Sequence, residues 1–483
     1  MNFRMIKQTL GYLLMFEAAF LLVPLITAIV FEEKKALFAF GVTILLCLVC
    51  GILLVSVLKP KNKQLFARDG FLIASASWLI MGLFGALPFV FSGAIPNYID
   101  ALFEIVSGFT TTGASILSEV ESLPKSMIMW RSFSHWVGGM GVLVFIMVFL
   151  PLSGGQNMHI MKAESPGPSV SKLVPRVKDT AFILYAIYVV MTIVEFIALL
   201  IAGNTTFDSI NLAFATAGTG GFGIRNDSMA SFSAVTQIII AVFMILFSIN
   251  FNSYYFILRR NFKDAFNTEV KVFLGIVIAA TTVIALNINL AGITGAQNIG
   301  DAFRHSLFTV SSLISTSGFS TLDFDLWPEL SKTILVLIMF TGGCAGATCG
   351  GIKLSRIILM LKGMTRELSK LTHPKQIKKI TLDSRPVDHE VVRSVNAYII
   401  CYVAVFFASF FLLSFDNYDF TTNFTAVTAT INNIGPGLEL VGPTQNFSFF
   451  SPFSKLILIF DMLAGRLELF PVLVLLAPST WKK

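Results

Sequence analysis

Four stretches of this sequence combine hydroxyl side chains with a closing glycine, a pattern suited to binding a cation through backbone oxygen. Each stretch starts with Asp and reaches its Gly 13 to 17 residues later. Glycine permits the backbone angles of a sharp return turn. Small side chains at the turn leave carbonyl oxygens free to replace the hydration shell of a dehydrated ion. The stretches are 100–115, 208–223, 301–320 and 419–437.

Three residues of each stretch, ending at the glycine, are the expected cation ligands. Few acidic residues lie beside them, so coordination is expected mainly from backbone oxygen. The fourth stretch departs from the others, because it reads Asn433-Ile434-Gly435 and contains no Thr there. We therefore expect potassium to pass with a measurable leak of sodium. The expected ligands are Thr111, Thr112, Gly113, Thr219, Gly220, Gly221, Thr316, Ser317, Gly318, Asn433, Ile434 and Gly435.

Each stretch also begins in a way that favours a short helix. Asp is a strong helix N-cap and suits the positive N-terminal end of the helix dipole. Because the stretches are too short to cross a bilayer, we expect half-helices that enter from outside and point their partially negative C-terminal ends toward a shared axis. An ordinary outer loop is the alternative for any single stretch, but four in register favour a repeat. The predicted N-caps are Asp100, Asp208, Asp301 and Asp419.

The segments that carry these stretches are typical of membrane spans. Hydrophobic residues make up 55% of the chain and charged residues only 13%, whereas about 25% of a soluble domain is charged. Several apolar runs have the roughly 20 residues needed to cross the hydrocarbon core. The ten expected spans are 10–31, 36–58, 71–92, 127–150, 181–203, 233–258, 271–293, 333–361, 395–415 and 453–478.

Basic residues concentrate in four of the connections between spans, at 59–68, 162–178, 259–263 and 353–385. The positive-inside bias places these connections, and with them both termini, in the cytoplasm. The net charge of +7 is therefore spread over short segments and does not form a nucleic-acid-binding face. Acidic residues in the outward connections would raise the local concentration of cations.

Repetition of span, half-helix, loop and span predicts the fold class. We expect an all-α integral membrane protein in which four pseudo-repeats of helix, pore half-helix and helix surround a central pore. Two extra transmembrane helices precede them. The expected divisions are 1–60 for the N-terminal hairpin, and 61–155, 156–262, 263–370 and 371–483 for the four pore repeats, the third of which contains an intramembrane gate loop.

A second glycine-rich segment interrupts the expected span 333–361. Five glycines in ten residues do not favour a straight helix, because each costs about 1 kcal/mol relative to Ala. We predict a flexible loop that crosses the pore below the cation site, with close helix packing through small residues as the alternative. A nucleotide-binding P-loop is excluded, because Ile352 and Lys353 follow the last glycine. The glycines are Gly342, Gly343, Gly346, Gly350 and Gly351.

Arg466 lies in the last apolar span, where a charge costs about 2.5–3.5 kcal/mol on insertion scales. It is expected either to form a positive barrier beside the glycine-rich segment or to pair with Glu468 or Asp461. Lys353 and Arg356 follow the same segment. They either transmit a pull from a cytosolic partner or anchor the span at the inner surface.

Other polar residues in the spans point to less specialised roles. Arg131 and His135 lie near an outer span end, and we interpret them as interfacial anchors. The histidines lack metal-ligand spacing, and the five cysteines lie in or beside apolar spans, which indicates packing. A membrane enzyme would need an acid, His or Cys constellation at an interface, and none is visible. A coupled transporter would need a relay of acidic residues within the spans, for which the candidates are Glu17, Glu104 and Glu195.

Several motifs resemble the Trk/Ktr/HKT superfamily of cation transporters over essentially the whole chain. They are the four stretches described above, the HWVGGMG segment at 135–141, the KAESPGP segment at 162–168 and the GRLE segment at 465–468. The match is closest to the TrkH type, the membrane subunit of bacterial potassium uptake. The KAESPGP segment and the two extra N-terminal spans favour this type over KtrB.

The resemblance implies potassium uptake across the inner membrane through a channel-like pore, with K⁺ as the permeant ion and no organic cofactor. It also implies a homodimer in membrane lipid, with one pore in each protomer, gated by a cytosolic, nucleotide-binding regulatory subunit of the TrkA type. No nucleic-acid partner and no enzymatic activity are expected. The filter role falls on the twelve ligands named above, and the gate role on the five glycines and Arg466. An H⁺- or Na⁺-coupled symporter of the KtrB type is the alternative.

Overall fold

The computed structural model describes residues 2–57, 67–141, 177–375, 379–383 and 385–481. Within these ranges nearly all regular structure is helical. The exception is a two-stranded antiparallel sheet between the last two long helices, in which β1 (Thr381–Leu382) pairs with β2 (Arg385–Pro386). The all-helical class expected from the sequence is therefore confirmed for the described residues.

The helices follow one another in groups along the chain. The first group is α1 (Phe3–Phe20), α2 (Leu22–Val30) and α3 (Lys34–Val57). The second is α4 (Ala67–Gly85), α5 (Leu87–Ser92), α6 (Tyr98–Phe109) and α7 (Lys125–Gly139). The third is α10 (Val177–Ile201), α11 (Thr206–Ala217), α12 (Ala234–Phe247), α13 (Phe251–Leu258) and α14 (Phe262–Ala265).

Two further groups complete the chain. One contains α15 (Thr268–Leu290), α16 (Ile299–Ile314), η1 (Phe324–Leu326), α17 (Glu329–Thr341) and α18 (Leu354–Thr372). The last contains α19 (His389–Leu413), η2 (Ser414–Asp416), α20 (Phe420–Ile431), η3 (Glu439–Val441), α21 (Pro452–Arg466), α22 (Phe470–Leu476) and α23 (Pro478–Trp481).

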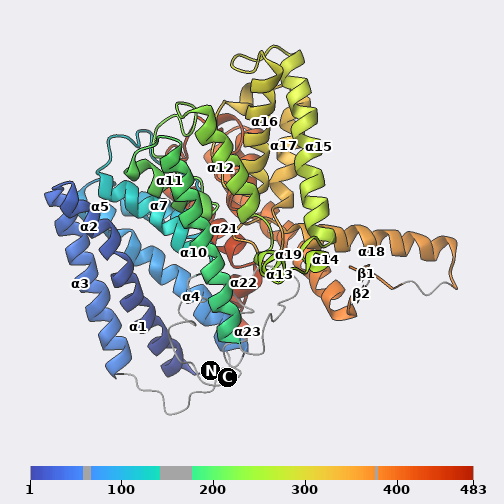
Figure 1. Ribbon diagram of the computed structural model, residues 1–483. Coiled ribbons are helices and arrows are strands. Elements are labelled where there is room, and N and C mark those ends of the chain that lie inside the picture. The colour runs from blue at the N-terminus through green and yellow to red at the C-terminus, as the bar shows by residue number, and fades with distance from the viewer. Residues whose placement is uncertain (1, 58–66, 142–176, 376–378, 384, 482–483) are drawn as a thin grey trace.

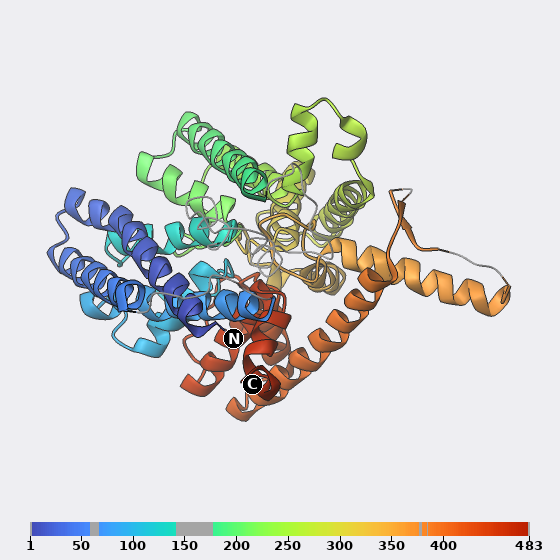
Figure 2. The same ribbon diagram turned by 90° about the horizontal axis from the view of Figure 1, so that it is seen from below.

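The groups are arranged around a central region in chain order. Seen from below, the blue, green, orange and red parts of the chain succeed one another around this region (Figure 2). Both termini lie at the same end of the molecule, and the connection between α15 and α16 lies at the opposite end (Figure 1). The helix α18 leaves the body and projects sideways.

Six helices, or helix pairs counted as one, are long and apolar enough to cross a membrane in the described residues. A further pair, α12 and α13, is together apolar enough to cross but is bent by 90°, so the residues expected to span at 233–258 form two helices. The expected spans 333–361 and 453–478 are each divided into two helices. For the span expected at 127–150, α7 covers the first part and residues beyond 141 lie outside the described ranges.

Four of the shorter helices, α6, α11, α16 and α20, coincide with the predicted half-helices. The predicted N-cap is confirmed only in α20, where the Asp419 carboxylate accepts from the Thr422 N–H at 2.8 Å. In the other three the Asp is the third helical residue, and the N-caps are Asn97, Thr205 and Asn298. An Asp in the first turn still benefits from the positive end of the dipole, which explains why the pattern pointed to the correct helices.

The N-terminal hairpin depends on a close crossing of α1 and α3. A Cβ added at Gly51 would lie 2.9 Å from the Gly11 carbonyl oxygen, and one added at Gly11 would lie 2.8 Å from the Gly51 oxygen. Small residues at such crossings let helix backbones approach each other in a membrane. Gly41, on the same helix α3, has open space around it.

We expect Gly51→Ala to destabilise the protein by about 1–3 kcal/mol, the usual range for overpacking. The added methyl would force α1 and α3 apart. Thermal unfolding in detergent measures the effect, with Gly41→Ala as the matched control that leaves the midpoint unchanged or higher. Equal midpoints for the two variants would contradict the crossing.

Candidate ion-binding site

Each of the four half-helices ends in a turn with the same backbone conformation. We call these the first turn (111–113), second turn (219–221), third turn (316–318) and fourth turn (433–435). Every turn begins with a non-glycine residue in the left-handed region, with φ between 54° and 57°, and ends with a glycine whose φ lies between 74° and 96°. A left-handed Thr or Asn is uncommon, so its recurrence at four equivalent places is a specific feature.

The same hydrogen bond ties each turn back to its own half-helix. The N–H of the middle residue donates to the carbonyl five residues earlier, over 2.8–2.9 Å. This bond satisfies one of the carbonyls left open at a helix C-terminus. The four donor and acceptor pairs are Thr112 and Ser107, Gly220 and Ala215, Ser317 and Ser312, and Ile434 and Ala429.

The four turns close into a ring. A Cβ added at Gly113 would lie 2.0 Å from the carbonyl oxygen of Gly220, so the last residue of the first turn touches the middle residue of the second. The same contact repeats from the second turn to the third, from the third to the fourth, and from the fourth back to the first. The added Cβ atoms would meet Ser317 O at 1.7 Å from Gly221, Ile434 O at 2.1 Å from Gly318, and Thr112 O at 2.8 Å from Gly435.

The structure therefore brings together all twelve residues predicted as cation ligands. A cavity of about 110 Å³ lies over the ring and is lined by the final glycine of every turn. The loops that follow the turns, including residues 114–120 and 222–228, form its walls. Backbone carbonyls and small side chains thus meet at the floor of a polar cavity, an arrangement that suits a dehydrated cation.

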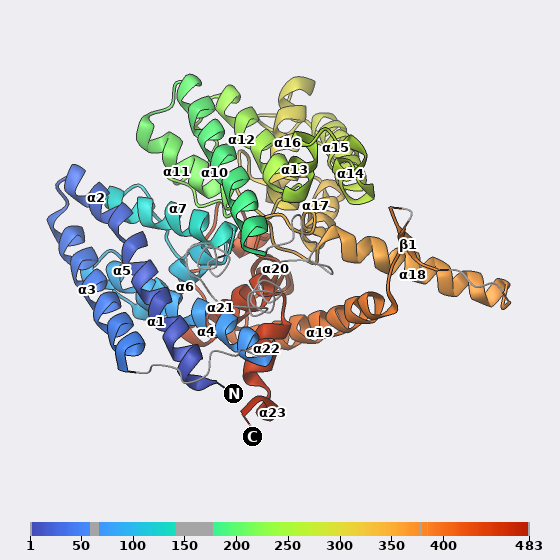
Figure 3. The same ribbon diagram turned by 60° about the horizontal axis from the view of Figure 1, so that its bottom comes forward.

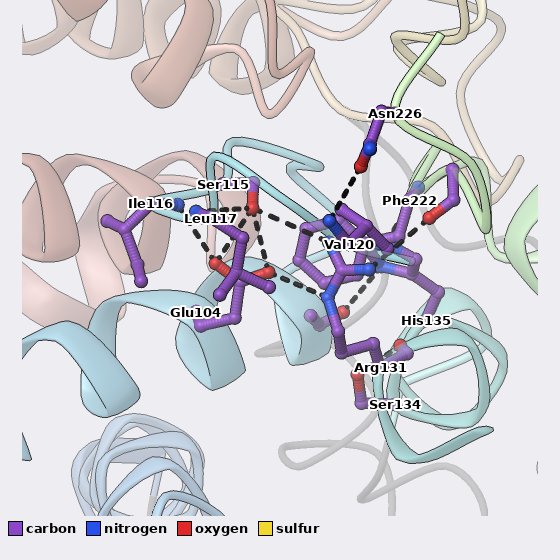
Figure 4. Close-up of polar contacts among 12 residues, drawn as sticks. Glu104, Ser115, Ile116, Leu117, Val120, Arg131, Ser134, His135, Phe222 and Asn226 are labelled. Carbon is purple, nitrogen blue, oxygen red and sulfur yellow. Dashed lines mark hydrogen bonds and ion pairs between the residues drawn. The ribbon is translucent and has the colours of Figure 1, made fainter. Parts of the chain in front are cut away.

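Arg131 is not an interfacial anchor, contrary to the sequence interpretation. Its side chain is 2% exposed and pairs with Glu104 at 2.8 Å, which is itself fully buried (Figure 4). Glu104 also accepts from the Ser115 hydroxyl and the Ile116 N–H, both just beyond the first turn. Arg131 donates to the Gly223 carbonyl at 3.3 Å, just beyond the second turn. The ion pair therefore links the loops that follow two neighbouring turns.

His135 lies behind the ring instead of at a membrane surface. Its Nδ1 lies 2.8 Å from the Gly108 carbonyl at the end of α6, and its Nε2 accepts from the Phe222 N–H at 3.3 Å. Because Nε2 accepts a hydrogen bond, a neutral imidazole carries its proton on Nδ1, and this Nδ1–H donates to the Gly108 carbonyl. A Cβ at Gly220 would lie 2.1 Å from the same ring. The imidazole thus supports the first and second turns from behind.

The glycine-rich segment forms a loop, as predicted, and we call residues 342–353 the Gly-rich loop. It joins α17 to α18 and lies against the third and fourth turns. The Gly350 N–H donates to the Thr316 hydroxyl at 2.7 Å, and a Cβ at Gly350 would lie 2.4 Å from the Asn432 carbonyl. Gly342, Gly346 and Gly351 have positive φ, whereas Gly343 and Gly350 do not.

The bend between α12 and α13 supports the other side of the Gly-rich loop. The Cys344 N–H donates to the Ser248 carbonyl at 3.0 Å, and the Phe251 N–H donates to the Gly346 carbonyl at 3.2 Å. Residues 248–250 lie between the two helices, so their backbone groups are available for these bonds. The bend between α12 and α13, which the sequence did not predict, thus binds the Gly-rich loop through these two backbone hydrogen bonds.

Arg466 connects the Gly-rich loop to the first turn. Its guanidinium donates to the Thr348 carbonyl at 2.6 Å and to the Thr111 hydroxyl at 3.2 Å. It also donates to the carbonyls of Gly138 and Gly139 at the end of α7. A positively charged group thus contacts both the ring and the Gly-rich loop.

The two carboxylates that the sequence offered as partners of Arg466, Glu468 and Asp461, bind other side chains. Glu468 forms an ion pair with Arg356, and Asp461 accepts from the Ser409 hydroxyl at 2.6 Å. Arg356 is buried and also lies 3.9 Å from the centre of the Tyr398 ring. Lys353 is 1% exposed and donates to the Cys349 carbonyl. The anchoring interpretation requires both basic residues to lie at an exposed surface. Neither Arg356 nor Lys353 does.

Within the described ranges, no relay of acidic residues connects the candidates for coupled transport. Glu104 forms an ion pair with Arg131. Glu17 and Glu195 are buried on two different helices, α1 and α10. Among the described residues no group of three His, Cys, Asp or Glu side chains is placed to hold a metal ion. The ring of turns is therefore the principal candidate site in the described structure.

A family model named TrkH and described as "Cation transport protein" matches residues 36–483. The chain belongs to the TrkH family. It is 35% identical over 491 aligned positions to the Trk system potassium uptake protein TrkH of Escherichia coli K12, covering all of both chains. It is 31% identical to the Trk system potassium uptake protein TrkG of the same organism, over 99% of each chain.

A solved structure agrees with the sequence comparison. The crystal structure of the potassium transporter TrkH from Vibrio parahaemolyticus matches with a TM-score of 0.88 and 33% identity, over 100% of both chains. The resemblance inferred from the motifs is thus confirmed. A TrkH-family chain is a multi-pass membrane protein for potassium transport, and it is a transporter rather than an enzyme.

Glu104→Gln is expected to lower the free energy of unfolding by about 3–5 kcal/mol, because it leaves the Arg131 guanidinium buried without its counter-charge. Asp208→Asn is the matched control. Asp208 pairs with Arg225 at 3.8 Å in a partly exposed setting, where such pairs contribute about 1 kcal/mol or less. Unfolding in detergent measures both variants, and a similar loss in the two would argue against the buried pair.

Proposed function

We propose that this chain takes up potassium through a channel-like pore in which the four turns form the selectivity filter. The closed ring of four turns carries the proposal, because it gathers backbone carbonyls from four distant parts of the chain at one place. The names of the TrkH relatives, which are potassium uptake proteins, support potassium as the cargo.

The electrostatics of the ring favour a cation. Each half-helix ends at its turn, and the C-terminal end of a helix carries a partial negative charge. Four such ends surround the same place. Carbonyl oxygens can then substitute for the water lost by a K⁺ ion. The fourth turn has Asn433 where the others have Thr, which supports a filter less strict than one of four identical strands.

We also propose the pseudo-repeat architecture that the sequence predicts. The recurring half-helix, left-handed residue and closing glycine support four repeats at 61–155, 156–262, 263–370 and 371–483, after a hairpin at 1–60. Both termini lie at one end of the molecule (Figure 1). Arg259 and Arg260, after α13, belong to a basic connection, which supports a cytoplasmic location for that end in an inner membrane.

The gate is assigned to the Gly-rich loop and Arg466. The loop touches the third and fourth turns, and Arg466 touches the first, so the two together lie across the path that leaves the filter. A positive charge there raises the energy of a passing cation. A homodimer with one pore in each protomer and a cytosolic, nucleotide-binding subunit of the TrkA type complete the proposal, supported by membership in the Trk system.

Purified protein in vesicles is expected to take up radioactive Rb⁺ along its own gradient without an added proton-motive force. Uptake that depends on a proton or sodium gradient would instead support the coupled symporter. A smaller flux of Na⁺ is expected in addition to the Rb⁺ flux, and complete exclusion of Na⁺ would contradict a filter that is less strict than four identical strands.

Gly221→Ala is expected to abolish Rb⁺ uptake, because the added methyl would clash with the Ser317 carbonyl in the ring. Gly203→Ala, also at positive φ but in open space, is the control that preserves uptake.

Arg466→Ala is expected to raise Rb⁺ flux several-fold, because it removes the positive charge from the exit of the filter. Arg466→Lys keeps a charge at this place and is expected to stay near the wild-type flux. Flux is compared at equal amounts of reconstituted protein. No change in the Ala variant would refute the barrier.

A further inference from the structure

A single buried carboxylate joins the first part of the Gly-rich loop to the start of α18, the helix that follows it. Glu269 is the second residue of α15 and is 6% exposed. Its Oε1 accepts from the Ala345 N–H at 2.8 Å and from the Ser355 N–H at 3.0 Å. These two donors lie ten residues apart and flank most of the loop. The carboxylate thus acts as a clasp across the loop, and charged acceptors make the stronger hydrogen bonds.

The loop needs such a support, because its backbone is strained at one point. Lys353 has a φ of 77°, a value that side chains other than glycine rarely adopt. Strained residues persist when their surroundings hold them in place. Lys353 lies two residues before Ser355, which Glu269 binds directly. Release of the clasp would therefore let this end of the loop relax.

The clasp is attached to the cytosolic linker between α18 and α19. Asp383 lies in the turn after β1, and its Oδ1 accepts from the Thr268 N–H at 2.8 Å and from the Thr268 hydroxyl at 2.6 Å. Thr268 precedes Glu269 directly. The sheet lies beside the base of α18 and the lower end of α15 (Figures 1 and 3). The Lys362 ammonium on α18 also donates to the Thr381 carbonyl at 2.7 Å.

We propose that Glu269 is a positioning residue that keeps the Gly-rich loop closed. We also propose that loss of the Asp383–Thr268 hydrogen bonds displaces Glu269 and so releases the loop. The contact is exposed, and water competes with exposed hydrogen bonds, so a protein that binds the linker at Asp383 can break it easily. Movement of Thr268 then displaces Glu269 and frees the loop at Ala345 and at the start of α18. The proposal deepens the proposed function, because it rests on the assignment of this loop as the gate.

The matched control is a second carboxylate that binds backbone N–H groups in another part of the fold. Glu33, between α2 and α3, accepts from the backbone N–H groups of Lys125 at 2.5 Å and Ser126 at 3.1 Å. Like Glu269 it accepts from two backbone N–H groups, but both of its donors lie at the start of α7, and it contacts neither the ring nor the Gly-rich loop. A general loss of stability affects both sites, whereas a gating effect is confined to Glu269.

The test compares full-length variants in vesicles without any regulatory partner. Glu269→Ala and Asp383→Ala are expected to raise Rb⁺ flux several-fold with an unchanged ratio of K⁺ to Na⁺ permeability, because the ring stays intact. Glu269→Gln keeps an acceptor oxygen in place and is expected to stay near the wild-type flux. Glu33→Ala is expected to leave flux unchanged. If Glu269→Ala does not fold, Asp383→Ala carries the test, because it removes only exposed contacts.

A second measurement follows the loop itself. Cys349 lies in the loop and is 1% exposed, so its labelling by a water-soluble maleimide reports on loop opening. The other four cysteines, Cys47, Cys50, Cys344 and Cys401, are replaced by Ala in this background. Faster labelling is expected in Glu269→Ala and Asp383→Ala, and wild-type labelling in Glu33→Ala.

The outcomes separate the two proposals. Wild-type flux and wild-type labelling in both Glu269→Ala and Asp383→Ala would overturn the clasp. Increased flux in Glu33→Ala would also overturn it, because the effect would then be non-specific. A complete absence of Rb⁺ flux in every variant, together with faster labelling in the clasp variants, would instead refute the pore while leaving the clasp intact.

Discussion

The structure depends on one steric constraint, the contact between the final glycine of each turn and the middle carbonyl of the next. A side chain at any of these glycines would lie within 3 Å of that oxygen, closer than atoms that are not bonded can approach. The ring therefore closes only with glycine at all four places. The half-helices, the outer loops and the groups behind the ring serve to bring these four backbones together and hold them there.

The ring is held mainly by groups that bind backbone atoms. His135 lies behind the first and second turns, and the Arg131–Glu104 pair links the loops that follow them. Buried carboxylates also bind main-chain groups in two places, since Glu104 accepts from the Ile116 N–H and Glu269 from the Ala345 N–H. Burying a charge is expensive unless it is paired and hydrogen-bonded, so each of these carboxylates is held firmly by the segments it joins.

The Gly-rich loop is held differently from the ring. Its contacts come from four separate parts of the chain: the third turn, the bend between α12 and α13, Arg466 on α21, and Glu269 on α15. Glycine gives the loop conformational freedom, and these contacts select one conformation from that freedom. A segment that is flexible by composition and fixed by a few polar contacts is suited to a switch between two states.

The sequence by itself determined the membrane class, the four turns and the Gly-rich loop. These features depend on composition, on the length of apolar runs and on the backbone freedom of glycine, which are all local properties. Only the tertiary structure decided that Arg131 and His135 are buried against the turns and the loops that follow them, that Glu468 pairs with Arg356 across 112 positions, and that the segment 233–258 bends. Such contacts depend on which helices pack together, and a residue pattern along one chain does not carry that information without the fold.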